Sequence, residues 1–151
     1  SMAIKGKNVR LTPQQVEELA EHVNSTTQTD SQMLRKLESL PVSADGKALL
    51  ADLLKITTRV GDVVLKIGRK ILDFVLNLVR QFPHLGFAAV LALVVGALVS
   101  MVPIVGAALS AILTPLGLAL GIAWGSYRDL SSDDLGERIK AFVDGFSGFA
   151  S

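Results

Sequence analysis

The sequence predicts an all-α protein in which a long amphipathic helix precedes a hydrophobic pair of helices. Residues 81–127, a run of 47, contain no Asp, Glu, Lys or Arg. Before this run, apolar residues recur every three or four positions from Leu49 to Phe82, which is the period of a helix face. Hydrophobic residues make up 50% of the chain and charged residues 19%, against roughly 25% in soluble domains. These observations favour helices that meet a lipid bilayer.

Residues 1–42 form a polar N-terminal helical region. Thr12, Pro13 and Gln15 have the types and spacing of a helix N-cap, a first-turn proline and a capping box, so a helix is expected over 13–23. A polar loop follows, and a second helix is expected over 30–40, where Pro41 ends it.

Residues 43–82 are expected to form one long helix that Ser43 caps. Its apolar stripe faces a polar side with seven basic and four acidic residues, so this side is cationic. The helix fits either an amphipathic helix at a membrane surface or a helix packed on its own bundle or on a second copy. Gly61 and Gly68 are interpreted as close-packing points inside the helix.

Residues 83–127 are expected to form a hydrophobic hairpin of two membrane spans, 85–102 and 104–127. Each span has about the 20 apolar residues that crossing a bilayer needs. Pro103 and Gly106 mark the turn, and the uncharged tip avoids the cost of moving a charge through hydrocarbon. A short amphipathic helix is expected within 128–151, beginning near Ser132.

Small residues recur at intervals of four inside the hydrophobic run, as in the close-packed interfaces of membrane helices. Three such rows are present, of which the last also includes Thr114. The predicted helix-packing residues are Ala92, Gly96, Ser100, Gly117, Gly121, Gly125, Gly106 and Ser110.

Both ends of the run carry residues typical of a membrane surface. Basic residues precede it, and aromatic residues lie beside a charge at its far end. The predicted interface residues are Lys66, Arg69, Lys70, Arg80, Trp124, Tyr127 and Arg128. The basic side predicts that both termini lie on the same, cytoplasmic, side of the membrane.

The sequence contains no pattern that indicates catalysis or a cofactor. There is no Cys, so thiolate metal sites and Cys nucleophiles are excluded. His22 and His84 lack a second ligand at helical spacing, and Asp133 with Asp134 is interpreted as a helix-capping pair. No phosphate-binding loop is present, and the basic residues alternate with acidic ones without aromatic stacking residues. We therefore expect no enzyme activity, metal, cofactor or nucleic acid.

The order of these parts resembles the C-terminal end of colicin-type pore-forming domains. The resemblance lies in Leu85 to Trp124, with its Pro103–Gly106 turn, and in the amphipathic helix that follows. Apoptosis-regulator (Bcl-2-like) proteins have a similar central hairpin. The resemblance implies a protein that can keep its hairpin hidden in water and insert it into a membrane.

A hydrophobic hairpin in water needs a full shell of helices, and the remaining segments are expected to be too few. The leading hypothesis is therefore a membrane-inserting protein that forms homo-oligomers and permeabilises a bilayer, with a soluble form before insertion. The alternative is a small two-span integral membrane accessory or adaptor protein that binds a protein partner through its cytoplasmic helices.

Overall fold

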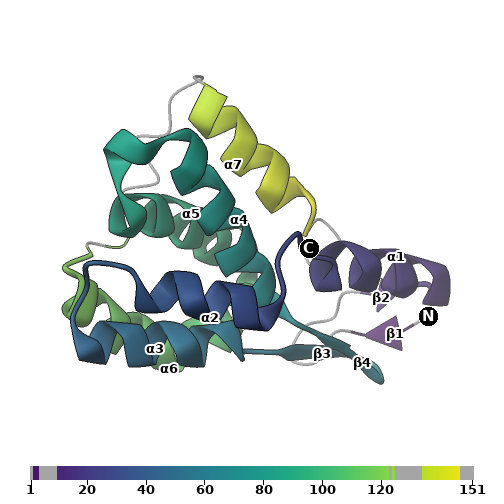
Figure 1. The fold of residues 1–151 in the computed structure, drawn as a ribbon. Helices are drawn as coiled ribbons and strands as arrows, with labels where there is room; N and C mark the ends of the chain where they lie inside the picture. The colour runs from purple at the N-terminus through teal and green to yellow at the C-terminus, as the bar shows by residue number, and fades with distance from the viewer. Residues whose placement is uncertain (1, 4–9, 123, 125–133, 147–151) are drawn as a thin grey trace.

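A computed structural model describes residues 2–3, 10–122, 124 and 134–146 of the chain. Within these residues the protein is mostly helical, with short antiparallel strand pairs as the other elements (Figure 1). This agrees with the predicted all-α class. The α-helices are α1 (Pro13–Asn24), α2 (Asp30–Glu38), α3 (Ala44–Leu54), α4 (Ile67–Gln81), α5 (Phe87–Met101), α6 (Pro103–Leu120) and α7 (Asp134–Asp144). The strands are β1 (Met2–Ala3), β2 (Arg10–Leu11), β3 (Thr58–Val60) and β4 (Val63–Leu65), and a 3-10 turn, η1, covers Pro83–Leu85.

The helix starts in the N-terminal half follow the predicted capping chemistry. The Thr12 hydroxyl accepts a hydrogen bond from the Gln15 backbone at 3.1 Å, and the Gln15 side chain accepts one from the Thr12 backbone at 2.9 Å. Thr29 and Gln32 repeat this capping box at the start of α2, and the Ser43 side chain caps α3. These bonds satisfy N–H groups that a helix leaves free in its first turn.

The prediction of one long helix over 43–82 is wrong. The segment forms α3, then the β3–β4 hairpin, then α4, and Val60 pairs with Val63 across a two-residue turn. Gly61 adopts φ +59° in that turn, a backbone conformation that L side chains rarely adopt. The turn is flanked by β-branched residues, which favour strands. The hairpin buries Val60 and Leu65, of which only Val60 belongs to the predicted helical stripe.

Gly68 is a close-packing point, as predicted, whereas Gly61 is not. Gly68 lies in the first turn of α4, where its N–H donates to the Ile56 carbonyl at 3.0 Å. A Cβ at position 68 would collide with the Leu53 carbonyl oxygen. The absence of a side chain therefore lets α4 begin directly against the end of α3.

The helix α5 forms the centre of the core. It packs against α4, α6 and α7. The helix α6 also packs against α3, on the side of the fold away from α7 (Figure 1). Val90, Val94 and Leu98 of α5 are completely buried. The other helices therefore cover α5, contrary to the expected shortage, but they leave one face of α6 exposed.

Candidate membrane-interacting surface

The helix α6 is the one described helix that is long and apolar enough to cross a bilayer. Its 18 residues have a mean hydropathy of 1.9, and 33% of them are buried. At 1.5 Å per residue the helix is about 27 Å long, close to the roughly 30 Å hydrocarbon thickness of a bilayer. The core helix of a soluble protein can have the same length and the same hydropathy. The exposed side of α6 is therefore the informative feature.

The exposed side of α6 carries no charge and is made of small and apolar residues. Leu118 is 81% exposed, and Met101, which precedes the helix, is 55% exposed. We call this surface the α6 face; it consists of Met101, Pro103, Ala107, Ser110, Ala111, Thr114, Pro115 and Leu118. An open groove of about 590 Å³ continues it toward α3, where Leu49 and Ala48 line the opposite wall. Large contiguous exposed apolar surfaces are typical of sites that interact with lipid or protein.

The first predicted span is shorter in the structure. The helix α5 has 15 residues, because the 3-10 turn Pro83–Leu85 and Gly86 precede its first residue, Phe87. It is about 22 Å long, less than a bilayer core. In contrast to α6, nine of its residues are buried. The described part of the chain thus contains one helix of membrane-spanning length, with a buried apolar helix before it.

The three rows of small residues have different surroundings. Ala92 and Gly96 are buried inside the fold, whereas Ser100 at the end of their row is exposed. Ser110 is exposed on the α6 face, and Gly106 beside it is partly buried. Gly117 is buried against Trp124, and Gly125 lies outside the described residues.

Several residues assigned to the turn and to packing have other structural roles. Pro103 is the first residue of α6, as expected for a proline after a turn, but Gly106 lies inside the helix rather than in the turn. Gly121 ends α6 with φ +68°, a left-handed cap with no heavy atom within 4 Å of an added Cβ. A side chain at Gly121 would therefore contact no other helix of the same chain, and its role in packing between copies stays a prediction.

Trp124 folds back onto α6 instead of extending the helix toward Arg128. Its indole N–H donates to the Leu113 carbonyl at 2.9 Å. The predicted second span, 104–127, is therefore shorter than expected, since α6 ends at Leu120. Tyr127 and Arg128, two of the predicted interface residues, lie outside the described residues.

The predicted interface cations lie around α4 and have different partners. Lys66 is exposed at the N-cap of α4, and Arg80 is exposed in its last turn. Arg69 forms an ion pair with Asp30 of α2 at 3.0 Å. The Lys70 ammonium donates to the Ser25 carbonyl at 2.9 Å. Arg69 and Lys70 thus attach α4 to the segment between α1 and α2.

Asp73 is a buried carboxylate that the sequence placed on the polar face of the long helix. It is 5% exposed, and it accepts bonds from the backbone N–H of Thr27 at 3.1 Å and of Gln28 at 3.2 Å. The Thr27 hydroxyl also donates to it at 2.9 Å, and Asn77 donates to the same hydroxyl at 2.9 Å. Nothing in the helical period distinguishes Asp73 from an exposed residue, because its donors lie 45 and 46 positions earlier.

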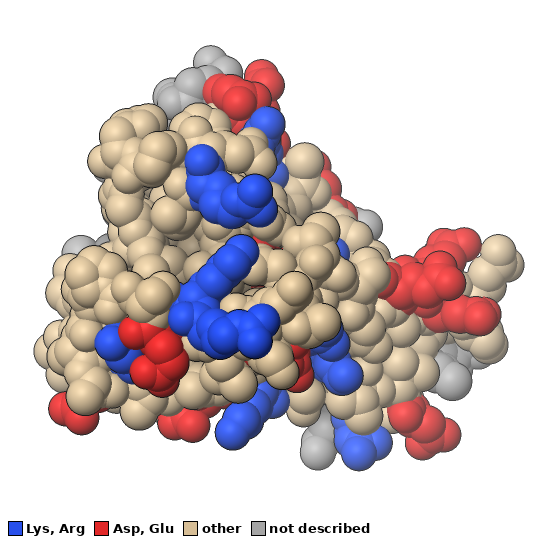
Figure 2. Space-filling model, in the orientation of Figure 1, with Lys and Arg blue, Asp and Glu red and all other residues tan. Residues whose placement is uncertain are grey.

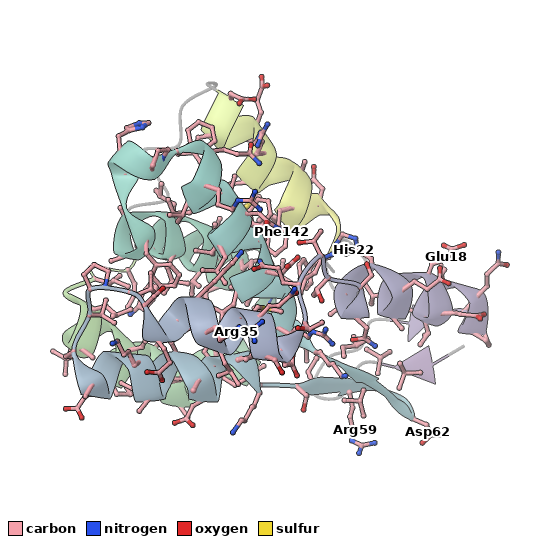
Figure 3. All side chains as sticks on the ribbon, in the orientation of Figure 1. Glu18, His22, Arg35, Arg59, Asp62 and Phe142 are labelled. Carbon is pink, nitrogen blue, oxygen red and sulfur yellow. The ribbon has the colours of Figure 1, made fainter. Side chains whose placement is uncertain are left out.

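The helix α7 packs against α5, and aromatic rings in and just after α7 contact α4 and α1. Phe142 stacks on Phe74 with ring centroids 4.0 Å apart, and Phe146 meets both Phe142 and His22 edge-on. Figure 3 shows His22, at the end of α1, and Phe142 of α7 on either side of this junction. An open pocket of about 510 Å³ lies beside the stacked rings, with Lys70 and Arg138 in its walls.

His22 is the titratable group inside this junction. Its Nε2 atom is buried without a hydrogen-bond partner and lies against Gly145, where a Cβ would collide with the ring. Burial lowers the pKa of His22, and the nearby positive charge of Lys70 lowers it further. Burial also lowers the pKa of Lys70, although Asp73 opposes that effect. A neutral imidazole therefore fits the junction better than a charged one.

The described residues contain no group of three or more His, Cys, Asp or Glu side chains placed to hold a metal ion. Comparisons with protein-family models, curated proteins and solved structures gave no match to this chain.

Proposed function

We propose that this protein inserts into a lipid bilayer from a folded, water-soluble form and permeabilises the membrane as an oligomer. The observation that carries the proposal is the α6 face, an uncharged and exposed side of a helix of membrane-spanning length. A second apolar helix, α5, lies directly before it in the chain and is stored in the core. Such an arrangement supplies apolar helices to a membrane while keeping most of their surface out of water.

Insertion would begin with contact between the α6 face and the lipid. Because α5 also packs on α4 and α7, and α6 on α3, the α5–α6 pair can enter the bilayer only after it separates from these three helices. The apolar residues released from the core would then be buried again in hydrocarbon, which offsets the loss of their packing. The Val102–Pro103 junction would lead, since neither it nor the adjoining helices carry a charge.

In the inserted state we propose two spans, with both termini on the same, cytoplasmic, side. The short α5 would require local thinning of the bilayer or extension of the helix toward Leu85. Ser110 and Thr114, one helical turn apart on the α6 face, would allow close approach between copies. Ser110→Leu should therefore reduce oligomers in membranes, with Leu34→Met on exposed α2 as a control for a surface change elsewhere.

Leakage of a dye from liposomes tests the proposal. Folded protein should release the dye and should appear in the membrane fraction after flotation. Absence of both leakage and flotation over a range of pH values and lipid compositions would refute the membrane function. Flotation without leakage would refute permeabilisation alone.

The second candidate function is that of an adaptor that binds a protein partner. The groove between α3 and α6 favours it, because Leu118, Leu49 and Pro115 form a mainly apolar depression that Asp45 and Ser43 also line. A monodisperse soluble protein that ignores liposomes, and whose Leu118→Lys variant loses a purified partner, would favour this function. Strict dependence on detergent would instead favour a resident two-span membrane protein.

A further inference from the structure

A hollow between α2 and the end of α4 is lined by three cations. Arg35 and Lys36 come from α2, and Arg80 comes from the last turn of α4, 44 positions further along the chain. The hollow has a volume of about 490 Å³. Lys and Arg side chains gather near the middle of this side of the molecule (Figure 2), and Arg35 lies on α2 in the same view (Figure 3). We call this site the basic hollow.

No acidic side chain lines the basic hollow. Of the two carboxylates on α2, Asp30 is paired with Arg69 at 3.0 Å, and Glu38 does not line the hollow. Among the described residues, the ion pairs do not include Arg35, Lys36 or Arg80. Three positive charges around one concave surface with no carboxylate in its lining create a positive potential that attracts an anion.

The remaining lining is polar and well anchored. Gln32 and Ser39 of α2 add an amide and a hydroxyl, and Thr27 and Gln28 form the side nearest the core. The backbone N–H groups of Thr27 and Gln28 are both bound to the buried Asp73, which fixes this segment against α4. The negative charge of Asp73 is thus occupied by donors of the protein itself. The wall of the hollow nearest the core is consequently fixed before any ligand arrives.

We propose that the basic hollow binds a phosphate group, carried either by the headgroup of an anionic lipid or by a soluble phosphate compound. Arg binds phosphate oxygens through paired N–H donors, and Lys adds a compact positive charge. The Gln32 amide N–H₂ in the wall can add a donor, whereas the Ser39 and Thr27 hydroxyls already donate to the Lys36 carbonyl and to Asp73. The inference that a phosphate group binds depends only on this lining. The inference that a lipid headgroup carries the phosphate depends on the proposed membrane function.

A matched pair of variants separates this site from general charge attraction. The test variant is Arg35→Gln with Arg80→Gln, and the control is Lys55→Gln with Arg59→Gln, two exposed cations away from the hollow. Figure 3 shows Arg59 at the β3–β4 hairpin, well apart from Arg35. Both variants lose two charges from exposed side chains, so circular dichroism and thermal unfolding should match those of the parent protein.

Glycerol 3-phosphate and inorganic phosphate would be titrated into the folded protein and followed by NMR shifts. Vesicles of phosphatidylcholine, with and without phosphatidylglycerol, would be used for flotation. If the headgroup is the source, the test variant should lose about 30-fold in affinity for anionic vesicles, at about a factor of five for each charge, while the control keeps most of it.

Phosphate-induced shifts at α2 and α4 that disappear in the test variant would support the site. If they occur without any vesicle binding, the source is a soluble phosphate, and the site holds although the membrane function fails. Equal weakening by the test and control variants would overturn the proposal, because it would show general charge attraction. The absence of binding to either phosphate or anionic vesicles would also overturn it.

Discussion

Ala111→Asp should prevent membrane insertion without unfolding the protein. Ala111 is the ninth of the 18 residues of α6 and is exposed on the α6 face, so a polar side chain there remains in water in the folded form. The expected loss of folding stability is about 0.7 kcal/mol, the difference in helix propensity between Ala and Asp. In the inserted helix the same position lies near the middle of the bilayer.

An Asp at the centre of a membrane-spanning helix costs about 3 kcal/mol. Since about 1.4 kcal/mol corresponds to a tenfold change in an equilibrium constant, insertion should weaken by about 100-fold. The much smaller loss of folding stability cannot account for such a change. Insertion and folding therefore respond to this substitution by clearly different amounts.

The assay measures dye leakage and flotation as a function of protein concentration, together with urea unfolding in the absence of lipid. Ala141→Asp on α7 is the matched control, because Ala141 is also exposed inside a helix and the change adds the same charge. The control should leak and float like the parent protein. Equal activity of all three proteins would refute the reasoning that α6 enters the bilayer.

Three further predictions concern the fold itself. In the folded protein the pKa of His22 lies below its ordinary value of 6.5. As the pH falls through 6.5 the unfolded state therefore binds more protons than the folded state, and the free energy of unfolding should decrease. The urea concentration at the unfolding midpoint should no longer depend on pH in this range for the His22→Phe variant, whereas the His84→Gln control should keep the dependence. Asp73→Ala should cost about 2–4 kcal/mol in urea unfolding, because it leaves buried N–H groups unpaired, and Asp73→Asn should cost less. Gly68→Ala should lower the melting temperature despite its better helix propensity, whereas Gly106→Ala, with its nearest contact at 3.4 Å, should not.

Local chemistry made the N-terminal helices predictable. Thr12 with Gln15 and Ser43 act within four residues of the helix starts, so their hydrogen bonds can be inferred from spacing alone. In residues 55–66, by contrast, spacing along the chain predicts the wrong element. Their apolar period suits a helix, but tertiary packing buries Val60 and Leu65 on a hairpin, and the Val-Gly-Asp-Val turn was the available signal.

The candidate sites differ in the same way. The α6 face could be anticipated as a helix, since a long uncharged apolar segment has few other stable forms. Which of its sides would remain uncovered depends on α3 and α5 packing against it. The basic hollow could not be anticipated, because Arg35 and Arg80 belong to helices that the sequence placed in separate regions.

The sequence by itself determined the helical class, several helix starts and the uncharged segment from residue 81 to 127. These are local properties, since composition and spacing act over a few residues. Only the tertiary structure decided that α5 is buried while one side of α6 is exposed, that residues 43–82 are interrupted by a hairpin, and that Asp73 lies in the core. Those outcomes depend on which distant segments come into contact, because burial and charge compensation are supplied by neighbours in space.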